Sequence, residues 1–422
     1  MIQKFPKFDL TLYQKELENG LQVLVIPNPK VENIYVTFTT KYGSKINTFI
    51  PNGQTEMVTV PDGIAHFLEH KVFEQKIGEE PFAFFGKRGA DTNASTSQDK
   101  TTYMFSGPTH FEENMNYLLD FVQSPYFTEE NVEKEKGIIK EELLMYADNP
   151  YILLNERSIF NSFHENPIRI PIGGTVDSIF QITKDMLYTC YNTFYHPSNM
   201  FVVVTGNVDK DHVFDVIQKN QAAKPFKDKQ KVTVQQYQEE DSIAVLEETL
   251  SKNVIVPKVS VNFKINYTPV KKEPLFYIRA SLLIYFQSLY GVTSLLLENL
   301  KKEGIVTEEL GINSIATDTH FLYMIAADTK EPKKFEQNIL ETIKKTKITE
   351  KEFLRKKKSL LSSTIYTSDN IYSFNDKIVG QMIQYGKPID DYQLLQDFTY
   401  AKFESIIKKL DFTHHGCVII DA

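Results

Sequence analysis

Three residues in the stretch GIAHFLEHKVFEQ have the types and the spacing for metal chemistry. His66 and His70 stand one helical turn apart, and Glu69 comes directly before the second histidine. On an α-helix, residues i, i+3 and i+4 share one face, so both imidazoles can reach the same ion. A zinc ion bound in this way would acidify a water molecule, and Glu69 could accept the proton. The motif therefore predicts a metal-dependent hydrolase.

The same residues have a simpler interpretation, because two partly buried histidines can also pack along a helix edge beside a solvated glutamate. A catalytic zinc needs a third protein ligand, which should be an acid or a histidine on an element facing this helix. The segment VEKEKGIIKEELLMY offers Glu133, Glu135, Glu141 and Glu142. Glu135 and Glu142 lie two helical turns apart and share a face. Residue chemistry alone does not choose between Glu141 and Glu142 as the third ligand.

The spacing of apolar residues predicts the elements that position these side chains. Residues 61–75 have the pattern of an amphipathic helix that begins near Pro61 and Asp62. Its apolar stripe consists of Ile64, Phe67, Leu68 and Val72. The β-rich segment NIYVTFTTKYGS precedes it and alternates in a way that predicts one covered face. NASTS and TTYMFSG then predict two short strands, so the first half is expected to be an α/β unit.

The length of the chain, 422 residues, predicts two domains. Residues 223–240 are polar and rich in lysine and glutamine, which is typical of an interdomain linker. The flanking ranges, 1–222 and 241–422, repeat one order of strands and helices, so they are interpreted as diverged copies of one α/β unit. The second copy has no counterpart of the two histidines. The chemistry is therefore expected in the first copy.

The composition excludes several classes of function. Hydrophobic residues at 41% and charged residues at 24% are ordinary for a soluble globular protein. The net charge of −8 gives no electrostatic reason to bind nucleic acid or an anionic membrane. No apolar run is expected to be long enough for a membrane span. The two cysteines, Cys190 and Cys417, lie far apart, which excludes a disulfide framework and favours a reducing cytoplasm.

Four segments together resemble the family of zinc peptidases that includes pitrilysin, insulin-degrading enzyme and the mitochondrial processing peptidases. They are HFLEH, GADTNASTS, EKEKGIIKEE followed by DNP, and FYHPSNMFVVVTGNVD. The resemblance implies an α+β fold of two homologous α/β units, each a mainly antiparallel sheet covered by helices, which form half of a clam-like chamber. The chain is most similar to small bacterial members that act beside a zinc-less paralogue. Some of these remove leader peptides from ribosomally made bacteriocins.

The resemblance also implies a role for each residue of the metal site. His66, His70 and Glu142 would hold one Zn²⁺ per chain, and Glu69 would be the general base. Glu135 matches the acid that supports one of the ligands in this family.

The resemblance implies that the substrate binds by β-augmentation along Asn93, Ala94 and Ser95. Active single-chain members carry an arginine and a tyrosine in the second half that hold the substrate and the developing oxyanion. Lys301 and Thr307 stand at those positions here, and neither can reproduce the contacts of arginine and tyrosine. A zinc-less paralogue is therefore expected to supply the pair in a heterodimer, whereas a homodimer would have to work without it.

The leading hypothesis is a cytoplasmic zinc endopeptidase that cleaves peptides or unstructured leader segments, with bacteriocin-leader removal as one candidate task. The rival hypothesis is a non-catalytic scaffold or peptide-binding subunit of a peptidase-like complex. A third hypothesis, a metal-dependent hydrolase of small molecules, agrees less well with the strand NASTS and the two-copy architecture. A test of zinc binding separates the two hydrolases from the scaffold. A test of peptides and small esters as substrates separates the peptidase from the hydrolase of small molecules.

Overall fold

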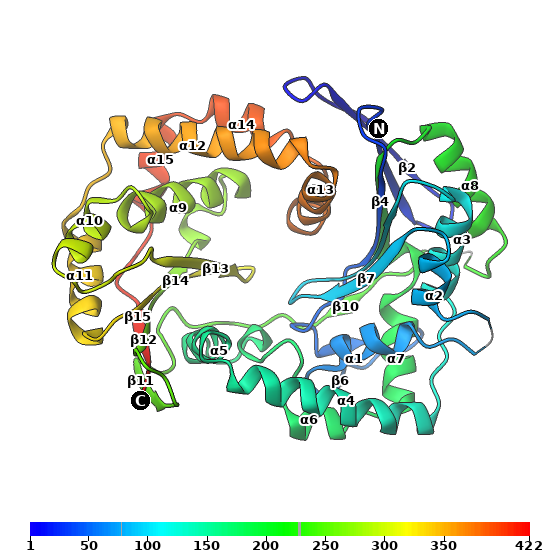
Figure 1. The fold of residues 1–422 in the computed structure, drawn as a ribbon, viewed down its shortest axis with the longest axis horizontal. Helices are drawn as coiled ribbons and strands as arrows, with labels where there is room; N and C mark the ends of the chain where they lie inside the picture. The colour runs from blue at the N-terminus through cyan, green and yellow to red at the C-terminus, as the bar shows by residue number, and fades with distance from the viewer. Residues whose placement is uncertain (77, 227–228) are drawn as a thin grey trace. The chain divides into compact units, whose positions relative to one another are not determined.

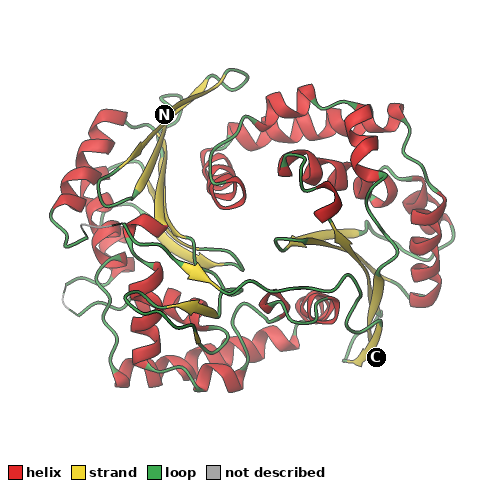
Figure 2. Ribbon diagram, turned by 180° about the vertical axis from the view of Figure 1, so that it is seen from behind, coloured by secondary structure: helices red, strands yellow, loops and turns green. Residues whose placement is uncertain are grey.

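The structure is a computed structural model that describes residues 1–76, 78–226 and 229–422. The chain folds into two compact units, and neither is continuous in sequence (Figures 1 and 2). Unit 1 contains Met1–Leu143, Pro171–Gln236 and Ile365–Asp390, and unit 2 contains Leu144–Ile170, Tyr237–Thr364 and Asp391–Ala422. These units differ from the predicted ranges 1–222 and 241–422, because 144–170 belong to unit 2 and 365–390 to unit 1.

Unit 1 is built on a seven-stranded, mainly antiparallel sheet whose edge strand β7 carries the predicted substrate-binding residues. The order is β1 (Ile2–Phe5), β2 (Leu10–Glu16), β3 (Gln22–Pro27), β9 (Met200–Gly206), β4 (Ile34–Thr40), β8 (Thr101–Gly107) and β7 (Asp91–Thr96). Only the pair β3 and β9 is parallel among these strands. A smaller sheet has the order β10 (Thr233–Val234), β5 (Thr48–Ile50) and β6 (Val58–Thr59). Strand β10 lies within the predicted linker 223–240, so part of that segment belongs to a sheet.

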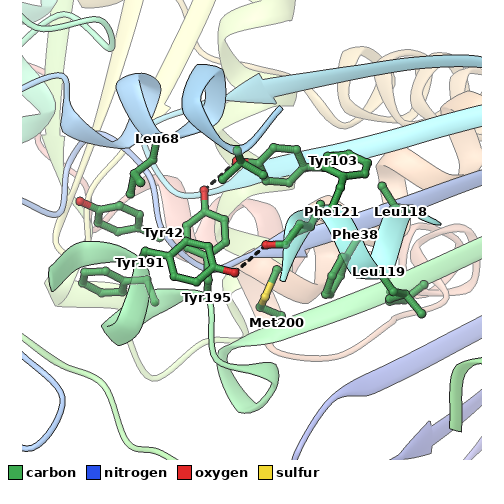
Figure 3. Packing of buried hydrophobic residues seen from close by; sticks show 14 of the residues in the cluster. Phe38, Tyr42, Leu68, Tyr103, Leu118, Leu119, Phe121, Tyr191, Tyr195 and Met200 are labelled. Carbon is green, nitrogen blue, oxygen red and sulfur yellow. Dashed lines mark hydrogen bonds between the residues drawn. The ribbon is translucent and has the colours of Figure 1, made fainter. Parts of the chain in front are cut away.

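Helices and a large apolar core cover one face of the seven-stranded sheet. The helices of unit 1 on this side are α1 (Ile64–Val72), α2 (Pro81–Gly86), α3 (Phe111–Val122), α4 (Glu129–Asp148), α6 (Val176–Phe180), α7 (Lys184–Phe194) and α8 (Lys210–Ala222), with a 3₁₀ turn at Pro197–Asn199. Figure 3 shows Leu68 of α1 in this core with Tyr103 and Tyr195, whose hydroxyl oxygens are 2.9 Å apart. The apolar side of the histidine helix is thus fixed against the sheet.

Helix α13 (Ile371–Tyr385) covers the opposite face of the same sheet. Its residues Phe374 and Ile378 pack in a second core with Phe201 and Val203 of β9. The fully buried amide of Asn375 donates to the carbonyl of Val203 at 3.1 Å and accepts from the Thr37 hydroxyl at 2.7 Å. All seven residues of β4 are buried. The prediction of a single covered face for this segment is therefore wrong, because a helix from much later in the chain covers the other face.

Unit 2 repeats the arrangement on a five-stranded sheet. The order is β11 (Glu247–Ser251), β15 (His415–Asp421), β12 (Lys258–Asn266), β14 (His320–Asp328) and β13 (Gly311–Ala316), with only β11 and β15 parallel among the described strands. Its helices are α5 (Pro150–Ser162), α9 (Leu275–Tyr290), α10 (Leu295–Lys302), α11 (Pro332–Lys345), α12 (Glu350–Asp369), α14 (Asp391–Asp397) and α15 (Tyr400–Ile407), with 3₁₀ turns at Pro167–Arg169 and Thr268–Val270. Helix α5 packs on β12 and β15. The prediction of two α/β units on mainly antiparallel sheets is confirmed.

The most apolar helical segment of the chain belongs to the core of unit 2. Residues 275–302 are long and apolar enough to cross a membrane by length and composition, contrary to the expectation from the sequence. However, 72% of the most apolar window is buried inside the protein, and the segment is divided after Tyr290 into two helices, α9 and α10. This pattern is typical of the core helix of a globular domain.

Candidate active site

A glycine turn sets the start of the histidine helix. Gly63 precedes α1 with φ of +88°, a conformation that residues with a side chain rarely adopt. A Cβ atom at Gly63 would lie 2.3 Å from the carbonyl oxygen of Gly173. The helix therefore begins at Ile64, slightly after the predicted start at Pro61 and Asp62. The predicted stripe of Ile64, Phe67, Leu68 and Val72 is buried, so the histidines face away from the core.

The three predicted metal ligands lie together. The Nε2 atom of His66 is 3.8 Å from one carboxylate oxygen of Glu142, and the Nε2 atom of His70 is 3.7 Å from the other. These distances are too long for hydrogen bonds. They are close to the roughly 3.4 Å that separates two ligand atoms around one tetrahedral zinc. Glu141 is exposed on α4, so the structure brings Glu142, and not its neighbour, to the histidines.

The donor atoms fit a divalent cation chemically as well as geometrically. Burial, together with the nearby His70, lowers the pKa of His66 to about 4, so the imidazole is neutral at neutral pH. The Nδ1 atom of His66 is buried and has no hydrogen-bond partner in the described part of the chain. Two imidazole nitrogens and one carboxylate form a ligand set that zinc prefers. Among the described residues, His66, His70 and Glu142 are the only such group whose ligand atoms lie within 4.8 Å of one another.

Glu135 lies within hydrogen-bond distance of His70. Its carboxylate oxygen Oε1 is 3.0 Å from His70 Nδ1. Burial by itself would lower the pKa of His70, but the hydrogen bond with Glu135 and the negative charges of Glu135, Glu142 and Glu69 together outweigh burial and raise that pKa. When Nδ1 carries the proton and donates to Glu135, the lone pair of Nε2 points toward Glu142. The predicted supporting acid therefore lies where it can fix the ring and the tautomer of a ligand.

Glu69 lies beside the metal-ligand cluster and is tied to the edge strand. Its carboxylate accepts a hydrogen bond of 2.5 Å from the hydroxyl of Thr96, the last residue of β7. Burial raises the pKa of Glu69, and the hydrogen bond from Thr96 offsets only part of this effect. A carboxylate whose pKa is shifted toward neutrality is a better general base than an ordinary surface glutamate.

The predicted substrate-binding residues lie on the exposed edge of the sheet. Asn93 and Ser95 are exposed, and Ala94 is half-buried. Strand β7 pairs with β8 on one side, with Ala94 opposite Tyr103, and no described strand pairs with its other side. The Ala94 N–H donates to the side chain of Asn93 at 2.8 Å and not to β8. The backbone of β7 can therefore accept a further strand.

Sequence reasoning missed two side chains at this site. Thr96 follows the three predicted residues of β7, but only the tertiary structure shows that it contacts Glu69. Lys71 is 1% exposed and contacts Glu135. A signal for Lys71 was available, since it follows Phe67 by one helical turn and so lies on the apolar stripe of α1.

Lys301 and Thr307 belong to unit 2. Lys301 lies in the last turn of α10, and Thr307 follows in the loop before β13. Both are exposed. The two positions therefore offer an ammonium group and a short hydroxyl where the resemblance leads one to expect a guanidinium and a phenol.

Comparisons with known proteins identify the family to which the chain is similar. The family model described as Insulinase (Peptidase family M16) matches residues 39–176, and the model described as Peptidase M16 inactive domain matches residues 181–360. The zinc protease YmfH of Bacillus subtilis is 42% identical over 338 residues, which cover 80% of this chain and 78% of that protein. A zinc protease of Rickettsia felis is 25% identical over 404 residues, which cover 93% of this chain and 92% of the relative.

Solved structures extend the likeness to the whole chain. The crystal structure of an M16-like peptidase from Alicyclobacillus acidocaldarius has a TM-score of 0.91 at 31% identity and covers 99% of both chains. The structure of a protease from Helicobacter pylori has a TM-score of 0.80 at 20% identity, covers 97% of this chain and 99% of that one, and indicates the fold alone.

Proposed function

Because the chain belongs to the M16 peptidase family, we propose that it is a zinc-dependent endopeptidase that cleaves peptides or unstructured segments of proteins. One observation carries the proposal. The donor atoms of His66, His70 and Glu142 converge next to Glu69, and Glu69 is hydrogen-bonded to Thr96 at the end of an open edge strand. A metal-ligand set, a general base and a peptide-binding edge therefore lie side by side.

The residues divide the chemistry between them. His66, His70 and Glu142 would hold the zinc ion, and Glu135 keeps His70 in the tautomer that binds it. Zinc bound there would polarise the scissile carbonyl and acidify a water molecule. Glu69 accepts the proton of the attacking water and passes it to the leaving amine.

Strand β7 supports an extended peptide as the substrate. A peptide that adds to this edge pairs its backbone with the backbone of Asn93, Ala94 and Ser95. Main-chain pairing requires a segment that is free of its own secondary structure, so folded proteins would be excluded. The alternative that the chain is only a peptide-binding subunit uses the same edge but has no need for the convergent metal ligands or for the buried base.

A second polypeptide is part of the proposal. Lys301 and Thr307 replace the arginine and tyrosine expected of a self-sufficient member, so a zinc-less paralogue would supply these groups in a heterodimer.

Both cysteines are buried and free, and burial raises the pKa of each thiol to about 12. Unreactive free thiols support a cytoplasmic location. Leader peptides of ribosomally made bacteriocins are one candidate substrate there.

Metal removal tests the proposed activity. The chain, alone and co-expressed with a zinc-less paralogue, is incubated with unstructured peptides before and after dialysis against a chelator. We expect cleavage by the pair to disappear with the metal and to return on addition of Zn²⁺ but not of Mg²⁺, because the ligand set contains two imidazoles. Mass spectrometry of the peptides and metal analysis of the protein are the measurements. A purified pair that binds no zinc would instead identify a scaffold.

A proline in β7 tests the mode of substrate binding. Ala94→Pro removes an N–H that does not pair with β8, and edge strands tolerate proline. We expect a higher KM for peptides with an unchanged zinc content, because the peptide loses a main-chain donor. The control Ser95→Ala removes an exposed side chain but leaves the backbone intact, so its KM should stay that of the native chain. Equal KM values for Ala94→Pro and the native chain would argue against β-augmentation.

A further inference from the structure

Lys71 is a buried charge at the back of the metal-ligand cluster. Its side chain is 2% exposed, and its Nζ atom lies 3.4 Å from Glu135 Oε2 and 3.2 Å from the carbonyl oxygen of Asn131. It also forms an ion pair with Glu74. A buried ammonium group is costly unless it is paired. These contacts connect α1 to the helix that carries two of the predicted site residues.

The carboxylate of Glu135 is shared between two donors. Its Oε1 atom is 3.0 Å from His70 Nδ1, and its Oε2 atom is 3.4 Å from Lys71 Nζ. Because both oxygens are engaged, the carboxylate has little freedom to rotate away from the histidine. His70 and Lys71 are adjacent in the sequence, so two consecutive residues of α1 contact the two oxygens of the same carboxylate.

We propose that Lys71 is a positioning residue of the metal site, which acts through Glu135 to fix the ring of His70. The inference rests on the proposed zinc site and extends it to a residue that does not touch the metal. Lys71 holds Glu135 in place as a charged acceptor, Glu135 holds the proton on His70 Nδ1, and Nε2 is left free for the ion. Loss of Lys71 would let Glu135 turn and would weaken zinc binding without removing a ligand.

Zinc affinity provides the test, with a matched control on α4. Lys71→Met removes the charge at similar length, and Lys136→Met does the same for a second buried lysine beside Glu135. Lys136 pairs with the exposed Glu133. Full-length proteins are stripped of metal and titrated with Zn²⁺ in competition with a chelating dye. We expect Lys71→Met to lower the affinity by about 10–100-fold, the usual cost of losing a ligand-supporting partner, and Lys136→Met to leave it unchanged.

A double-mutant cycle separates positioning from a general loss of stability. If Lys71 acts through Glu135, the pair Lys71→Met and Glu135→Gln should bind zinc no more weakly than Glu135→Gln alone. Lys71→Arg keeps the charge and should recover part of the affinity. Additive effects, or equal affinities for Lys71→Met and the native chain, would overturn the inference. A native chain that binds no zinc would instead refute the proposed function on which the inference rests.

Discussion

Replacement of Glu69 with glutamine is expected to lower peptide cleavage by about 10²–10⁴-fold, the usual contribution of a general base, at an unchanged zinc content. Glutamine has the shape of glutamate, and its carbonyl oxygen can still accept the hydrogen bond from Thr96. It cannot take a proton from water. Cleavage rates measured with the partner present, together with metal analysis of the same samples, give the result directly.

The control for this experiment is a glutamate far from the chemistry. Glu56 is exposed in the connection between β5 and β6, so Glu56→Gln makes the same chemical change without touching the site. We expect native rates for this variant. Full activity of Glu69→Gln would show that another group accepts the proton and would refute the proposed mechanism, even if zinc were still required.

The second large effect is a loss of zinc affinity, which we expect from a substitution in α4. The adjacent residues Glu141 and Glu142 differ there, because Glu141 is exposed and Glu142 lies near the histidines. Glu142→Ala removes one of three convergent ligands, so zinc affinity should fall by more than the roughly 10–100-fold expected for a supporting residue. Glu141→Ala deletes an identical side chain that is exposed, and its affinity should stay native. Competition titrations with a chelating dye measure both, and circular dichroism checks that both variants are folded.

The zinc affinities of the Glu141→Ala and Glu142→Ala variants can also disprove the assignment of Glu142 as the third ligand. If Glu141→Ala weakens zinc binding and Glu142→Ala does not, α4 is rotated relative to the position described, and the third ligand is the other glutamate. If neither variant changes the affinity, the metal site does not involve α4. In both cases the assignment of Glu142 would be wrong.

The sequence predicts the part of the site that lies within one helix. His66, Glu69 and His70 share a face because of helical periodicity alone, and the apolar stripe of α1 identifies the opposite face as buried. The choice of Glu142 over Glu141 depends on how α4 is rotated about its own axis. That rotation is fixed by the packing of α4, which lies far from α1 in the sequence. Spacing along the chain cannot supply that angle.

Contacts between elements explain what sequence reasoning missed. Thr96 reaches Glu69 because the end of β7 passes beside α1, and a polar residue at a strand end gives no sign of such a partner. The burial of both faces of β4 depends on α13, which follows it by more than half the chain. Alternating polar residues in β4, such as Thr37, therefore imitate a solvent-facing side, although Thr37 bonds to the buried amide of Asn375.

The origin of α13 has a consequence for the synthesis of the protein. The face of the seven-stranded sheet opposite α1, with Phe201 and Val203 of β9, is covered by Phe374 and Ile378. This covering segment emerges from the ribosome only after most of unit 2 has been translated, although Asp391–Ala422 of unit 2 still follow it. Until α13 has been translated, the sheet that positions the metal-ligand cluster therefore has one apolar face exposed to solvent. A partly folded chain of this kind is prone to aggregation or to binding by a chaperone. Translation has to reach residues 371–385 before the first unit can be complete.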